Sequence, residues 1–144
     1  MQKLHKKIVS ATAILLMSCA MGAHNAAYAS KKPTFIAAHY SPVVAPQLGI
    51  APIQVHVYFC SVPASIGACT NANALVNKSF KLKMGTYTIG TYVTESHGYS
   101  LIDTTVPFNP ATHMGPTIEV IFAGDNSNFP TTQTIPPQKA LQIP

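Results

Sequence analysis

The chain has 144 residues, of which 47% are hydrophobic and 9% are charged, with a formal net charge of +5. It contains no arginine. Because arginine supplies the bidentate fork that grips phosphates and guanine edges, a nucleic-acid partner is disfavoured. Twelve prolines argue against long helices. The composition therefore predicts an all-β protein whose surface uses Thr, Ser, Asn and Gln in place of charges.

Residues 1–29 have the features of an export signal. A cationic start with three lysines precedes an apolar run of about 16 residues, and a small-residue stretch ends in Ala27-Tyr28-Ala29, the A-x-A pattern that a signal peptidase cuts. The run is shorter than the ~20 residues of a membrane span, and no later stretch reaches that length. We therefore expect a periplasmic or secreted mature chain that begins at Ser30 and has no transmembrane helix.

A lipoprotein signal is the alternative interpretation of this segment. Leu16-Met17-Ser18-Cys19 resembles the lipobox of bacterial lipoproteins, in which the cysteine is acylated and anchors the protein to a membrane. Cleavage after Ala29 is favoured, because Met17 fits the lipobox poorly and the sequence stays apolar past Cys19. Cleavage there leaves six lysines and four carboxylates, a net charge of +2.

The first predicted elements of the mature chain are two strands and a loop. Phe35–Tyr40 is a candidate strand inside a proline-containing segment. From Ile53 to Cys60 apolar and polar residues alternate with a period of two, which predicts a half-buried strand with Phe59 and its apolar partners toward the core. Ser61–Asn73 is then a loop rich in small residues.

Alternation continues in the second half of the mature chain. It predicts four more strands, namely Ser79–Met84, Thr86–Thr94, Tyr99–Val106 and Thr117–Ala123. Ser96-His97-Gly98 predicts a hairpin turn, so that the strand after it returns along the strand before it.

These elements predict one domain. About six or seven short strands without intervening helices indicate a small antiparallel β-sandwich over residues 30–124. Residues 125–144 hold four prolines and show little periodicity. We expect them to form an extended or disordered tail, with pairing to the sheet or to a partner as the alternative.

The segment Phe80–Ile89, with Gly98-Tyr99 after it, resembles the strand–turn–strand unit of prealbumin-like and immunoglobulin-like exported modules. The resemblance covers about 20 residues and implies a sandwich of one of these two kinds. It carries no functional residue across.

Cys60 and Cys69 are the most specific chemical signal in the mature chain. Two cysteines in an oxidising compartment, with no others to pair with, most often form a disulfide. The bridge would close a loop of about ten residues and stabilise the fold by roughly 2.5–3 kcal/mol on the chain-entropy estimate. We expect a structural staple that holds the 61–68 loop against the outer side of the sheet. A redox role is disfavoured because the spacing is not C-x-x-C.

A metal site is the alternative functional hypothesis. Exported proteins can hold copper with His and Met side chains, and the candidates here are His56, His97, His113 and Met114. Their spacing matches no compact metal motif, so this hypothesis requires at least three of them to converge. The favoured expectation is scattered surface histidines and no cofactor.

A small hydrolase is the third hypothesis. Glu95 and His97 stand two residues apart beside the predicted turn, where they can share a strand face and hydrogen-bond. No G-x-S-x-G or S-x-x-K motif supplies a nucleophile, so we predict no catalytic residue and no enzyme.

Tyr58 and Tyr92 fall on faces that the alternation assigns as outward. A rigid exposed ring offers contact area at low entropic cost, so these two tyrosines define a candidate binding surface. The equal alternative is a face covered by the chain's own terminal segment. The favoured function is an exported, non-enzymatic binding or structural module of the cell envelope, whose partner is another envelope or extracellular protein.

Overall fold

The structure is a computed structural model that describes residues 30–42, 49–63 and 69–140. The chain divides into two compact units, Met1–Lys32 and Pro33–Pro144. The predicted export signal, residues 1–29 with the lipobox cysteine Cys19, lies outside the described residues. Within the described ranges, no helix has the length and hydropathy that crossing a membrane requires.

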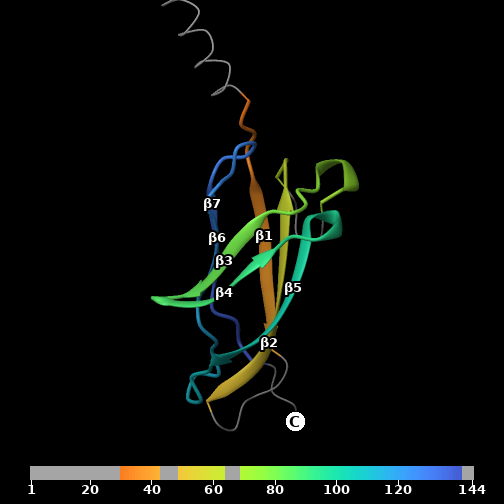
Figure 1. The fold of residues 1–144 in the computed structure, drawn as a ribbon. Helices are drawn as coiled ribbons and strands as arrows, with labels where there is room; N and C mark the ends of the chain where they lie inside the picture. Colours follow the sequence, from red (N-terminus) through yellow and green to blue (C-terminus); the bar gives the residue numbers. More distant parts are fainter. Residues whose placement is uncertain (1–29, 43–48, 64–68, 141–144) are drawn as a thin grey trace, which may run out of the picture. The chain divides into compact units, whose positions relative to one another are not determined.

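The predicted all-β fold is confirmed, since the described residues form two antiparallel sheets (Figure 1). One sheet has the order β1-β2-β5, with bounds Phe35–Pro42, Ile50–Cys60 and Tyr99–Pro107. The other has the order β4-β3-β6-β7, with bounds Tyr87–Val93, Ser79–Met84, Ile118–Phe122 and Thr131–Ile135. Two short 3-10 turns interrupt the strands, η1 at Asn71–Asn73 and η2 at Ser96–Gly98.

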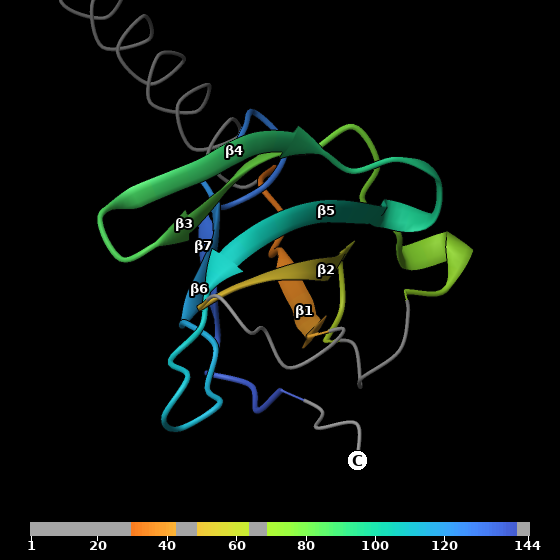
Figure 2. The same cartoon turned by 90° about the horizontal axis from the view of Figure 1, so that it is seen from below.

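The two sheets share one hydrophobic core. Strand β2 alternates as predicted, and its inward residues, among them Phe59, are fully buried. The Phe59 ring lies 5.2 Å from that of Phe80 on β3 and 5.4 Å from that of Phe122 on β6, measured between centroids. Figure 2 shows β2 and β5 side by side, with β3 and β4 as a separate pair. Burial of each large apolar side chain stabilises the fold by about 1.5–3 kcal/mol.

The predicted hairpin between Thr86–Thr94 and Tyr99–Val106 is wrong. Strand β4 pairs with β3 and β5 pairs with β2, so η2 carries the chain from one sheet to the other. At this turn His97 has φ 62° and Gly98 has φ 65°, two left-handed residues in succession. A Cβ atom on Gly98 would lie 2.5 Å from the Phe59 carbonyl oxygen, so the turn packs against β2 and requires glycine.

The outward assignment of Tyr92 is also wrong. The register of β3 with β4 places Tyr92 opposite Phe80, which faces the core. The Tyr92 ring lies 6.0 Å from the Phe80 ring and packs against the core. The register shifts between Leu82, which pairs with Gly90, and Lys83, which pairs with Thr88. Ile89 of β4 is therefore the extra residue of a β-bulge, and it packs inward as well. Because a bulge inserts one residue, alternation cannot be continued across it.

The domain extends past residue 124, so the predicted boundary there is wrong. Thr131–Ile135 forms β7, which pairs with β6, and this is the alternative in which the segment joins its own sheet. Further along, the backbone N–H of Gln138 donates to the Tyr40 hydroxyl at 2.9 Å, and that hydroxyl donates to the Pro116 carbonyl at 2.8 Å. Residues 141–144 of the predicted tail lie outside the described residues.

Candidate functional site

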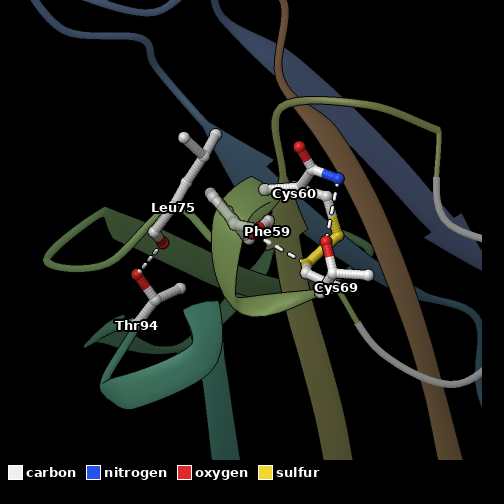
Figure 3. The surroundings of a disulfide bond; sticks show 7 residues. Phe59, Cys60, Cys69, Leu75 and Thr94 are labelled. Carbon is white, nitrogen blue, oxygen red and sulfur yellow. Dashed lines mark hydrogen bonds between the residues drawn. A yellow bond between two sulfur atoms is a disulfide. The ribbon is translucent and has the colours of Figure 1, made fainter.

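The predicted disulfide joins Cys60, the last residue of β2, to Cys69, with the two Cα atoms 5.5 Å apart (Figure 3). Both cysteines are buried, and the Cys69 sulfur lies 3.1 Å from the Phe59 carbonyl oxygen. The same carbonyl accepts a hydrogen bond from the backbone N–H of Leu75 at 2.9 Å. The bridge therefore anchors the segment after β2 to the strand itself, as a structural staple does.

A buried threonine continues this anchor toward the other sheet. The Thr94 hydroxyl donates to the Leu75 carbonyl at 2.7 Å (Figure 3). It also accepts a hydrogen bond from the backbone N–H of Lys78 at 2.9 Å. The Lys78 ammonium group then pairs with the Asp125 carboxylate at 2.6 Å. Segment 75–78 is thus held from both sides, by the end of β4 and by the β6–β7 connection.

The pKa of the Asp125 carboxyl lies below its ordinary value. Burial raises this pKa, but the hydrogen bond from Lys78 and those from the backbone N–H groups of Ser127 and Asn128 lower it by more. Asp125 therefore remains ionised to lower pH than a free aspartate.

The residues of the metal hypothesis come from separate elements of the fold. His56 lies on β2, His97 in η2, and His113 with Met114 in the connection between β5 and β6. In the part of the chain that the structure describes, no three His, Cys, Asp or Glu side chains are grouped so as to hold a metal ion. The three histidines therefore do not form a metal-holding group in the described residues.

Glu95 and His97 of the hydrolase hypothesis are both exposed. Glu95 uses its backbone to close the turn, since its N–H donates to the Tyr99 carbonyl at 2.7 Å and its carbonyl accepts from Gly98 at 3.2 Å. Both residues are described, and no hydrogen bond joins their side chains. What the structure shows for this pair is its backbone role in closing the turn.

A different cluster lies on the outer face of the β1-β2-β5 sheet. Because Phe59 and every second residue before it on β2 point inward, the residues between them point outward. Three of these outward residues of β2 have a partner directly opposite on a neighbouring strand. The pairs are His39 with His56, Tyr99 with Tyr58, and Asp103 with Gln54. We call these six residues the His–Tyr face: His39, Gln54, His56, Tyr58, Tyr99 and Asp103.

Four rings from three strands are in continuous contact on the His–Tyr face. The His39 and His56 rings stack with centroids 4.8 Å apart and planes within 2° of parallel. The Tyr99 hydroxyl lies 2.9 Å from His56 Nδ1, within hydrogen-bond distance. The Tyr99 ring in turn contacts the Tyr58 ring, with centroids 4.8 Å apart and planes tilted by 32°.

The rest of the His–Tyr face is polar and open. The Gln54 side-chain amide donates to the Asp103 carboxylate at 3.0 Å. An open pocket borders this pair, lined by Pro52, Ile53, Gln54, Asp103 and Thr104. Leu101, which lies opposite His56, is 46% exposed, while His56, Tyr58 and Tyr99 are half-buried. The face is a shallow surface and not an enclosed cavity.

Two groups on this face have shifted pKa values. Burial, and then the nearby His39, lower the pKa of His56, while Asp103 acts in the opposite direction. Burial, and then Tyr58 and Asp103, raise the pKa of Tyr99. Both shifts favour the neutral forms, so neutral rings form this contact at pH 7.

Tyr58 lies on this outer face, where the alternation places it, but Tyr92 belongs to the other sheet and faces inward. The two predicted binding tyrosines therefore do not share a surface. Tyr58 has Tyr99 as its partner instead.

Comparison of the chain with protein-family models, with curated proteins and with solved structures finds no match in any of the three.

Proposed function

We propose that the protein is an exported, non-enzymatic module of the cell envelope that binds its partner through the His–Tyr face. The observation that carries this proposal is the contact of His39, His56, Tyr99 and Tyr58 on one open sheet surface. An antiparallel sheet needs only one apolar face to fold, so its outer face is free to serve another purpose.

The proposed partner is another envelope or extracellular protein. Tyrosine supplies rigid contact area and a hydroxyl group at low entropic cost, which suits protein recognition. A small-molecule site is expected to be concave and to enclose most of its ligand, and the His–Tyr face is open. Asp103 is the one acidic residue among its six members and none is lysine or arginine, so shape and hydrogen bonding, more than net charge, would determine the choice of partner.

Export is part of the same proposal. The A-x-A pattern at Ala27–Ala29 supports cleavage there, with acylation of Cys19 as the alternative. The disulfide between Cys60 and Cys69 supports an oxidising compartment, since such bonds persist outside the cytosol. The mass of the processed protein distinguishes the two routes, because a lipoprotein would begin at Cys19 and carry acyl chains.

We also propose that the fold is an immunoglobulin-like sandwich and not a prealbumin-like one. The constant-type immunoglobulin domain has strands ABED in one sheet and CFG in the other. In this chain the orders β1-β2-β5 and β4-β3-β6-β7 follow that plan, except that the fourth strand pairs with the third and joins the second sheet.

A pull-down from the envelope of the source cell tests the proposed binding face. The bait is the processed protein, in wild-type form and with the double substitution Tyr58→Ala and Tyr99→Ala. Tyr87→Ala is the matched control, because Tyr87 is 63% exposed but lies on β4 of the other sheet. We expect the double variant to lose most of the captured partner, by about tenfold or more, as for loss of anchoring aromatics.

The control variant should capture as much partner as the wild type. Circular dichroism of each bait checks that the sheets remain folded. Equal recovery by the wild type and the double variant, with both folded, would contradict binding through the His–Tyr face.

A further inference from the structure

We infer that the stacked histidines make the His–Tyr face a proton switch: one proton is tolerated within the stack, and a second separates the two rings in mildly acidic solution. This inference rests on the proposed function, since the same surface would bind the partner, and it adds how that binding is regulated.

The geometry of the stack gives the two protons different consequences. His39 and His56 are directly opposite on neighbouring strands, and their rings are parallel at 4.8 Å. A single proton places an imidazolium over a neutral ring, which is an attractive arrangement. Two protons place like charges directly opposite each other on antiparallel strands, which is destabilising. A first proton on the stack therefore disfavours a second one, and this is the physical basis of the proposed switch.

Tyr99 links the second proton to the rest of the face. A neutral His56 can accept a hydrogen bond at Nδ1 from the Tyr99 hydroxyl or donate one to it, whereas the protonated ring can only donate. Charging His56 therefore fixes Tyr99 as the acceptor. It also drives the His56 ring away from His39, and Tyr99 carries this movement to Tyr58, whose ring it contacts.

The charged and titratable groups around His56 come from three strands. His39 faces it from β1, Tyr99 and Asp103 from β5, and Tyr58 lies on the same face of β2. The turn η2 also packs against β2, but its His97 is exposed and is not among the groups that shift the His56 pKa. Burial and His39 outweigh Asp103, which is already engaged by Gln54. This balance keeps His56 neutral near pH 7 and leaves its protonation to lower pH.

Nuclear magnetic resonance of the histidine side chains tests the switch without any ligand. The sample is the full chain as processed by the expressing cell, titrated from about pH 8 to pH 4.5, a range that brackets the ordinary histidine pKa. Wild type is compared with His39→Asn, which removes the stacking partner at an exposed position. His113→Asn is the control, because His113 lies in the connection after β5 and outside the face.

We expect the His56 midpoint to rise in His39→Asn by on the order of half a pH unit or more, because the repelling charge is gone. In the wild type, the Tyr58 and Tyr99 ring signals should change together with the second histidine step. His113→Asn should leave the His56 midpoint unchanged. An unchanged His56 midpoint in His39→Asn would overturn the inference, and so would a stack whose ring-to-ring contacts persist at the acid end of the titration.

Partner capture at two pH values separates this inference from the proposed function. Wild type should release most of the captured partner between pH 7.5 and about pH 5, within the range where histidine titrates, and His39→Asn should release a smaller fraction of whatever amount it captures at pH 7.5. Coupled titration with no partner captured at either pH would refute the proposed function and support the switch. Equal capture at both values by wild type would refute the switch and support the proposed function.

Discussion

The outer faces of the two sheets differ sharply, although both consist of antiparallel strands over one shared core. On the β4-β3-β6-β7 sheet, Lys83 lies opposite Glu119 and Lys81 lies opposite Thr91, and among these described residues no ion pair or hydrogen bond joins the side chains. On the β1-β2-β5 sheet, the His–Tyr face is a chain of ring contacts and hydrogen bonds. The face of the β4-β3-β6-β7 sheet is ordinary solvated surface, whereas the side chains of the His–Tyr face contact and orient one another.

This contrast shows where to look for function in a sheet protein. The core constrains only the inward residues, so an outer face of independent polar side chains satisfies folding. Contacts among outward rings go beyond that requirement, and for this reason we propose the β1-β2-β5 surface as the place of recognition.

The largest expected effect comes from the core beneath both faces. Phe59→Ala removes the ring that contacts Phe80 and Phe122 in the other sheet. We expect the free energy of unfolding to fall by about 3–5 kcal/mol, as for other buried aromatic truncations. Urea denaturation measures this loss. Leu101→Ala, beside the His–Tyr face, should change stability by about 0.5 kcal/mol or less, and a loss of stability comparable to that of Phe59→Ala would mean that this surface is part of the core.

Loss of the disulfide should have the next largest effect. The double substitution Cys60→Ala and Cys69→Ala removes the staple at the end of β2 and should cost roughly 2.5–3 kcal/mol of stability. Partner capture should persist at pH 7.5, because the His–Tyr face does not include the bridge. If the double cysteine variant kept its full stability but no longer captured the partner, the disulfide would have a role in binding and not in stability.

The smallest expected effect concerns acid and the ion pair beside the second sheet. The Asp125 pKa lies below its ordinary value in the folded protein, so its contribution to stability is present above the unfolded pKa and is lost as pH falls through the folded one. Asp125→Asn should therefore reduce the loss of stability between about pH 5 and pH 2, relative to wild type. Because Asp125 is partly exposed, the difference will be modest. Identical acid profiles would remove Asp125 from this account.

The sequence predicts much of the fold because alternation is a local signal. Strand β3 begins and ends where the pattern predicts, at Ser79 and Met84, and the inward residues of β2 are those expected. The predictions fail where alternation within one segment is not enough, because the structure depends on how strands pair with one another. The bulge opposite Leu82 changes which residues of β4 face inward, and η2 sends β5 to a different sheet. Neither the bulge nor the change of sheet produces a periodic pattern in the sequence, so alternation cannot predict them.

The site was less predictable than the fold. Tyr58 follows from alternation within one strand, but its contact with Tyr99 depends on how two distant strands pair. The hydrogen-bonded groups of His56 and Tyr99 are 43 residues apart in the chain. Residue type alone makes His56 a candidate metal ligand with His97 and His113, whereas its neighbour in the structure is His39. Register across a sheet, which unites these residues, is set by the whole fold.

Site-specific photo-crosslinking in the source envelope tests the central claim most directly. A benzoylphenylalanine in place of Leu101 places the probe beside His56, and one in place of Thr91 places it on the outer face of the other sheet. Both positions are exposed, so neither probe disturbs the core. A protein partner crosslinked from position 101 and not from position 91 is the predicted result. Crosslinks from position 91 alone, or equally from both, would contradict recognition through the His–Tyr face.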